Sequence, residues 1–518
     1  MRSRAIVLLV SGILLVGCAE RLPIGPGTGT SGSGSGSGAG GSGSGSSGSG
    51  GEGGGDIPFN TGDPPACDPT ITVKSDGRAL LVNDPAVLAP FTLERVLKQL
   101  LDRSTPSDLT PLSVLQRLFD AENDAASAVF PDVIHCDTEG NPAFKNGAPA
   151  GCPRAEGALA TSMGMLTPGD PDYFAPIALV NRIDLMPASL QTCGEYRIVF
   201  AKQSGKSDPS NRVFLIFEGA LTNPSPGDLW ACEAVARHWA GLDQEKDPKV
   251  IKESLDTFYF KGIPGFGAVV DPMSFGLLAT EDDPYGASRG QVRISQRMQD
   301  PWEMREMRFL TGGGVQGSME PGFLPVTVKN NPLPSLFAGI GDQGACGNFQ
   351  SLFVSADVQS LSSTTTAKIR MGIANEFNAG ESALEGPAGP DYVTAIQGSS
   401  FAQAITDQLA TLPSDPACDG DPLTAEAIAA RAATQTCAGC HAPSAFLGPE
   451  RKIGCNQTWP DSLGGAHIDE KGALSPALKE AFLPRRASVM EAYLRACDLG
   501  AIKDNLQPVS GGKGVPPK

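Results

Sequence analysis

Two stretches near the middle of the chain decide its fold: EYRIVFA at residues 195–201 and RVFLIFEGAL at residues 212–221. Both are rich in β-branched and aromatic residues, which suit the pleated, half-buried surface of a strand. The segment that joins them is rich in Gly, Ser, Asp, Pro and Asn, residues that favour turns and loops. We therefore predict an antiparallel pair of strands with a long connecting loop.

Further strand and helix patterns surround this pair. Short strand patterns follow at QVRIS (291–295), WEMREMRFL (302–310) and LPVTVK (324–329). Apolar residues recur at helical spacing in five segments, residues 91–102, 110–123, 232–242, 249–260 and 391–412. Such a mixture indicates an α+β domain with a mainly antiparallel sheet, which we place at residues 67–411.

This middle domain shows little sign of chemistry. Four charged residues are expected to form a buried ion network of structural importance, Arg182, Asp184, Glu195 and Arg197. His135 and His238 are interpreted as packing or surface histidines. Neither a G-x-S-x-G nor an H-E-x-x-H motif occurs. The role of the domain is therefore not predicted from its sequence.

The N-terminus, MRSRAIVLLVSGILLVGCAE, reads as an export signal. Its basic start precedes an apolar run from Ala5 to Val16, which is shorter than the roughly 20 residues of a membrane-spanning helix. The sequence LVGC at residues 15–18 resembles the lipobox of bacterial lipoproteins. That resemblance implies a signal peptide at residues 1–17, a lipid on Cys18 and, because Ala19 follows it, the outer membrane. An ordinary signal peptide that ends in Cys is the alternative.

A Gly/Ser-rich segment follows the lipobox and is expected to be a disordered tether, residues 18–66. It would hold the folded part near the membrane without spanning it. The whole chain has 518 residues and a formal net charge of −17, and no basic run exceeds two residues. This charge argues against nucleic acid or an anionic lipid surface as a partner.

The chain has 12 cysteines, and in an exported protein most of them should form disulfides. Apart from Cys18 and the two cysteines of a C-terminal motif, nine remain. Two local pairs are plausible, Cys136–Cys152 and Cys193–Cys232. The other connections do not follow from the sequence.

The segment RAATQTCAGCHAPSAF contains C-x-x-C-H at residues 437–441. On one helical turn, Cys437 and Cys440 can form thioethers to the two vinyl groups of a haem while His441 binds the iron. An alanine-rich helix with Thr424 as N-cap is expected before the motif. After a loop, Ser475 and Pro476 begin a short helix, and Pro484 is expected to separate it from a final helix with an apolar stripe at Val489, Met490, Tyr493, Leu494 and Ala496.

This order of elements resembles a class I cytochrome c, in which the two end helices pack across each other. The resemblance implies a small all-α domain at residues 412–500 that binds haem c, followed by a disordered tail at residues 501–518. The second iron ligand departs from the family pattern because no Met lies between His441 and Met490. His467, which follows two glycines in the loop, is the preferred second ligand. Met490 and an open or water-bound position are the alternatives.

Two other readings of the motif remain. A zinc site could combine Cys437, Cys440, Cys455 and His467, although it would leave His441 unused. A redox disulfide between Cys437 and Cys440 would normally occur in a thioredoxin-like βαβ context, which is missing here.

The preferred functional hypothesis is a membrane-anchored electron carrier that meets redox partner proteins. The alternatives are a haem-dependent oxidoreductase of the peroxidase type and a non-redox cell-surface binding lipoprotein with a zinc or disulfide module. Whether the chain is an enzyme is left open.

Overall fold

The computed structural model describes seven stretches of the chain, residues 64–138, 151–276, 290–297, 302–312, 320–338, 344–384 and 389–507. The expected signal peptide, Cys18 and nearly all of the expected tether lie outside the described residues, as does the chain beyond residue 507. Among the helices in these stretches, none combines the length and the apolar character needed to cross a bilayer.

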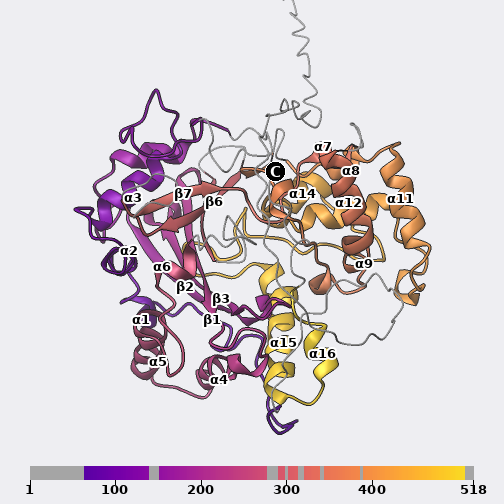
Figure 1. The fold of residues 1–518 in the computed structure, drawn as a ribbon, viewed down its shortest axis with the longest axis horizontal. Helices are drawn as coiled ribbons and strands as arrows, with labels where there is room; N and C mark the ends of the chain where they lie inside the picture. Colours follow the sequence, from indigo (N-terminus) through magenta and orange to yellow (C-terminus); the bar gives the residue numbers. More distant parts are fainter. Residues whose placement is uncertain are drawn as a thin grey trace, which may run out of the picture.

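An eight-stranded antiparallel sheet organises the first part of the fold (Figure 1). Seven strands lie in the order of the sequence, and β8 pairs with the start of β6. The strands are β1 (Leu81–Val82), β2 (Phe174–Arg182), β3 (Thr192–Lys202), β4 (Arg212–Thr222), β5 (Gln291–Arg297), β6 (Glu303–Leu310), β7 (Gly322–Val326) and β8 (Ser382–Ala383). Strands β3 and β4 are the predicted antiparallel pair, with Arg197 opposite Glu218. The predicted α+β class with a mainly antiparallel sheet is therefore confirmed.

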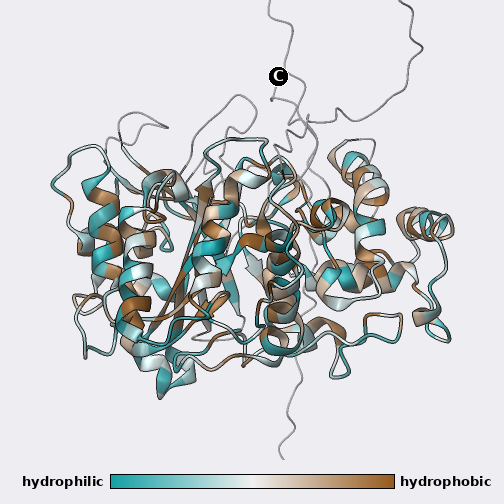
Figure 2. Cartoon of the chain, turned by 90° about the horizontal axis from the view of Figure 1, so that it is seen from below, coloured by the Kyte–Doolittle hydropathy of each residue, from teal (hydrophilic) through white to brown (hydrophobic). Residues whose placement is uncertain are grey.

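Helices pack against this sheet and share one apolar core with it. They are α1 (Pro85–Leu88), α2 (Leu93–Asp102), α3 (Pro111–Asp120), α4 (Glu233–Gly241), α5 (Pro248–Asp256) and α6 (Pro272–Phe275). Helix α2 shows why these segments are helical: the Thr92 hydroxyl accepts a hydrogen bond from the Arg95 amide, and the apolar positions fall on one buried side. Figure 2 shows apolar and polar sides on several helices.

A second group of helices, on the right of Figure 1, forms its own apolar core. The helices in this part are α7 (Pro334–Phe337), α8 (Ala345–Leu352), α9 (Val358–Leu361), α10 (Tyr392–Ala395), α11 (Ser400–Leu409), α12 (Ala425–Thr434), α13 (Cys437–His441) and α14 (Pro443–Leu447). Thr424 caps α12, as predicted. The pattern at residues 391–412 gives two helices because Gly398 adopts a φ of 69° and Ser399 caps a new helix.

The last helices are α15 (Leu483–Arg495) and α16 (Leu499–Lys503). Pro484 does not separate two helices, because a π-helical turn over Ala477–Phe482 leads directly into α15. Proline is accepted in the first turn of a helix, where its missing N–H costs no hydrogen bond. Ser475 does act as a cap, since its hydroxyl accepts a hydrogen bond from the Leu478 amide.

The C-terminal segment contributes to both cores. Helix α12 packs in the helical core, whereas Met490, Tyr493 and Leu494 of α15 pack in the core of the sheet. The packing of the two end helices across each other, implied by the cytochrome c resemblance, is thus not confirmed. The expected tail is wrong for residues 501–507, since α16 occupies part of them and Gln507 donates to the Asp184 carbonyl at 2.9 Å.

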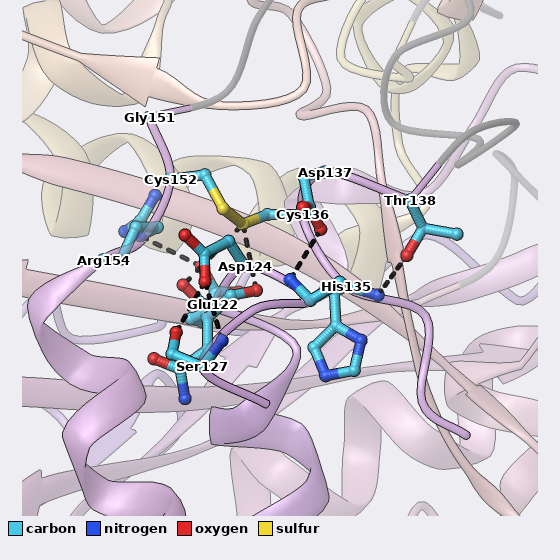
Figure 3. The surroundings of a disulfide bond; sticks show 12 residues. Glu122, Asp124, Ser127, His135, Cys136, Asp137, Thr138, Gly151, Cys152 and Arg154 are labelled. Atoms are coloured by element: carbon cyan, nitrogen blue, oxygen red, sulfur yellow. Dashed lines mark hydrogen bonds and ion pairs between the residues drawn. A yellow bond between two sulfur atoms is a disulfide. The ribbon is translucent and has the colours of Figure 1, made fainter. Parts of the chain in front are cut away.

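Four disulfides join the described chain. Both predicted local pairs are present, and Figure 3 shows Cys136–Cys152 beside Glu122 and Arg154, whose side chains form an ion pair at 3.0 Å. Two further pairs were not predicted, Cys418–Cys455 and Cys67–Cys497. The latter spans 430 residues and ties the start of the described chain to the end of α15.

Candidate functional site

The C-x-x-C-H motif forms its own short helix, α13, directly after α12. The Thr436 hydroxyl caps it by accepting a hydrogen bond from the Gly439 amide at 3.0 Å. The Ala438 amide donates to the Ser382 hydroxyl of β8 at 3.0 Å, which ties the motif to the sheet. Gly439 is needed because a Cβ atom there would lie 1.9 Å from the Ala433 carbonyl oxygen. Contacts with both α12 and the sheet therefore fix the position of the motif.

His441 is held in one tautomer. Its ring stacks on Trp302 with centroids 5.2 Å apart, and its Nδ1 lies 3.0 Å from the Gly465 carbonyl oxygen. A carbonyl oxygen only accepts, so Nδ1 carries the proton and Nε2 keeps a free lone pair. Burial lowers the pKa of His441 to about 4, so the ring is neutral near neutral pH. A neutral imidazole whose other nitrogen donates to a carbonyl is the usual form of a metal-binding histidine.

The loop with His467 is fixed by the sheet. Arg212, the first residue of β4, donates to the Gly464 carbonyl at 2.8 Å and pairs with Glu470 at 2.6 Å. Trp302 Nε1 donates to the Gly465 carbonyl at 3.0 Å, so this oxygen holds both Trp302 and His441. Gly464 and Gly465 have φ values of 57° and 89°, which glycine adopts without strain.

His467, the preferred second ligand, lies beside the motif. Its Nε2 is 3.3 Å from Cys440 Sγ, and its Nδ1 is 3.0 Å from the Ser475 hydroxyl. The rings of His441 and His467 have centroids 4.5 Å apart. Two imidazoles on opposite sides of one metal ion need about 6 Å, given metal–nitrogen bonds of about 2 Å. Binding of one metal ion by both rings would require their centroids to separate by about a further 1.5 Å, given metal–nitrogen bonds of about 2 Å.

Met490 lies away from this arrangement. It is fully buried in the core of the sheet, and its sulfur is 3.6 Å from Asn181 Nδ2. It does not line the cavity described next. Two other methionines do line it, Met304 of β6 and Met371, and both precede the motif in sequence. Sequence reasoning missed them because it sought a ligand only after His441.

A cavity of about 440 Å³ opens beside α13, between the sheet and the helical core. This volume lies within the range of roughly 300–1,000 Å³ typical of ligand and cofactor sites. Cys437, Cys440, His441 and His467 all line it. Its apolar walls come from both cores and include Val199, Phe214, Ile216, Ile369, Trp459 and Phe482.

Both motif cysteines are free thiols. Burial raises the pKa of Cys437 to about 11 and that of Cys440 to about 12, so both are protonated at neutral pH. A buried thiol is a weak nucleophile and a weak metal ligand until it loses its proton. Both cysteines are therefore poorly reactive until a proton is removed.

A charged wall of the cavity comes from the sheet. Arg197 of β3 pairs with Glu195 at 2.8 Å and with Glu218 of β4 at 2.9 Å, and Arg293 of β5 pairs with Glu218 at 3.3 Å. Burial and the neighbouring cation Arg308 lower the pKa of Lys329, which lines the same wall, to about 8. The four residues of the predicted ion network therefore form two separate ion pairs, Arg197 with Glu195 and Arg182 with Asp184, and both pairs line the cavity beside the motif. The available signal was the charged pair Glu195 and Arg197 at alternate positions of an otherwise mostly apolar strand.

A second charged cluster lies at the same cavity, around Asp184. The Arg182 guanidinium donates two hydrogen bonds to this carboxylate, of 2.9 and 3.0 Å. Burial alone would raise the pKa of Asp184, but Arg182 and Arg486 outweigh it and lower the value to about 2. Arg370, Arg485 and Arg486 line the cavity next to this pair. The cavity thus combines apolar walls with an excess of cations.

The alternative zinc site loses a ligand, because Cys455 is joined to Cys418. Within the described stretches, no group of three or more His, Cys, Asp or Glu side chains is arranged to hold a metal ion. The two remaining histidines do not line the cavity: buried His135 contacts Asp120 at 3.1 Å, and His238 stacks on Phe258.

The chain matches no protein-family model, and neither a curated protein nor a solved structure matches it.

Proposed function

We propose that the chain is an exported, lipid-anchored c-type haem protein that transfers electrons to or from partner proteins. The observation that carries the proposal is the state of His441, a neutral imidazole with a bare Nε2 at a cavity lined by two free thiols. The lipid anchor and the location at the outer membrane rest on the LVGC sequence at residues 15–18.

The residues around the cavity fit a haem in three respects. Cys437 and Cys440 would hold it through thioethers, and His441 would bind its iron. The apolar walls would cover the faces of the ring, and the arginines would meet its carboxylates. When bound, the haem would supply a one-electron couple, with a potential set by its axial ligands and by its surroundings.

The chain's own residues prepare this site. The Gly465 carbonyl keeps the proton of His441 on Nδ1, and the Trp302 ring fixes the plane of the imidazole. Hydrogen bonds from Arg212 hold the loop that provides that carbonyl.

The test is intact-mass analysis and a haem stain of the protein made in a host that attaches haem c to exported proteins. We expect the wild type to carry one haem and Cys440→Ser to lose stable double attachment. Ser444→Ala, an exposed position on α14, is the matched control and should retain the haem. A wild-type protein with the mass of the bare polypeptide would refute the proposal.

A second candidate function, a haem-dependent oxidoreductase, is favoured by the short distance between the two imidazoles. At 4.5 Å the His467 ring sits too close to His441 for both to bind one iron without a movement of the loop. An iron with one open position would bind carbon monoxide when reduced, whereas a second protein ligand would oppose this. His467→Ala separates the cases: its spectrum should change only if His467 is a ligand.

A further inference from the structure

Four arginines from three distant segments gather at one end of the cavity. Arg182 ends β2, Arg370 follows the short helical turn Thr366–Lys368, and Arg485 and Arg486 lie in the first turn of α15. The chain as a whole carries a net charge of −17, so this local concentration of cations runs against its overall charge.

The cluster holds more positive charge than its carboxylate can balance. Asp184 is engaged by Arg182 through two hydrogen bonds. Within the described part of the chain, Arg370, Arg485 and Arg486 form no ion pair. Arg485 Nη2 donates to Asn505 Oδ1, but Arg370 Nη1 and Arg485 Nε are buried without a hydrogen-bond partner. Four guanidinium groups against one carboxylate leave an excess of three positive charges.

Such an arrangement is costly unless something neutralises it. Burial and the positive charge of Arg485 lower the pKa of Arg370, and burial and the positive charge of Arg182 lower that of Arg486. Buried donors without acceptors forfeit the hydrogen bonds that they made to water. An anion in the cavity would remove both penalties, because each guanidinium offers a planar fork of donors that matches a carboxylate or an oxyanion.

We propose that Arg182, Arg370, Arg485 and Arg486 form a binding site for an anionic oxygen group carrying about two negative charges. The site lies beside the thiols and imidazoles of the motif. Two sources share this chemistry: the carboxylates of a bound haem, and a small free oxyanion or dicarboxylate from solution. The first source rests on the proposed function and the second does not, since the excess charge is present in the polypeptide itself.

The test is calorimetric titration with sulfate, phosphate and succinate. It uses the wild-type protein as isolated and the double variant Cys437→Ser/Cys440→Ser, which cannot attach haem. Whether the ligand is a haem carboxylate or a free anion, the proposal requires at least one of these three anions to bind to the double variant. Adding Arg370→Gln should weaken that binding at least tenfold, whereas adding Arg237→Gln, which removes an exposed arginine on α4, should leave it unchanged.

A second measurement guards against misfolded variants. Without an anion, Arg370→Gln should unfold at the same temperature as its parent or higher, because it removes one of the cluster's uncompensated positive charges and a buried donor without an acceptor. An arginine with a purely structural role would give the opposite result.

The wild-type titration then separates the sources. Anion binding to the haem-loaded wild type indicates a free ligand. Loss of binding on haem attachment, with an altered haem reduction potential in Arg370→Gln, indicates the haem carboxylates. Absence of anion binding to the double variant, or equal binding after Arg370→Gln, would overturn the proposal. Absence of haem from the wild type would instead refute only the proposed function.

Discussion

The protonation of His441 in the haem-free protein offers a direct test of how the site is built. Burial lowers the pKa of this imidazole from 6.5 to about 4. Since one pKa unit corresponds to about 1.4 kcal/mol, protonating the folded site costs about 3 kcal/mol more than protonating the unfolded chain. The site can therefore be tested by changing the pH, without any substitution in the protein.

The sign of the effect on stability follows from proton linkage. Because the folded pKa lies below the unfolded value, the unfolded chain takes up the proton first as the pH falls. The contribution of His441 to stability is complete above pH 6.5. It is lost progressively as the pH falls from about 6.5 to about 4, and little more is lost below that.

Histidine-selective nuclear magnetic resonance can follow this group, because the chain has only four histidines. His441→Gln would identify its signal, and long-range nitrogen–hydrogen correlations would show which nitrogen carries the proton. We expect a midpoint near pH 4 and a proton on Nδ1. A midpoint near pH 6.5, or a proton on Nε2, would refute the tautomer argument and with it the preparation of Nε2 for a metal.

Three further predictions concern stability, each measured by thermal or urea unfolding. Gly439→Ala forces a methyl group into the last turn of α12 and should destabilise the protein by about 1–3 kcal/mol. Gly347→Ala, which has open space around it, should have no such effect. Equal effects of the two substitutions would contradict the close packing at Gly439. Arg431→Met removes four hydrogen bonds to carbonyls and should cost about 3 kcal/mol or more; a neutral result would show that those carbonyls find other donors. Replacing Cys418 and Cys455 by Ser opens a 37-residue loop and should cost about 3–4 kcal/mol; an unchanged midpoint would contradict the bond.

Local features of the fold could be predicted because they depend on neighbouring residues. The β3–β4 pair followed from its strand pattern, and the caps at Thr424 and Ser475 followed from single side chains at helix starts. The nearby pairs Cys136–Cys152 and Cys193–Cys232 were plausible because short loops close easily.

The cavity could not be predicted, because its walls come from segments far apart in the sequence. Nothing near Arg182 or Arg370 indicates that both face the motif, and Arg486 looks like an ordinary polar position on a helix. Pro484 was expected to separate two helices, but it lies in the first turn of α15, where a proline is tolerated, directly after the π-helical turn Ala477–Phe482. The motif itself was evident from spacing, but its contact with the sheet through Ser382 was not.

The Cys67–Cys497 disulfide has a mechanical consequence. It closes almost the entire folded polypeptide into one covalent ring, with the N-terminal chain leaving at Cys67. When the chain is pulled between its two ends, the tension passes through this bridge and bypasses the residues between Cys67 and Cys497. The strands and the cavity then carry little of the load, so the site should stay intact under such a pull until the bridge is reduced.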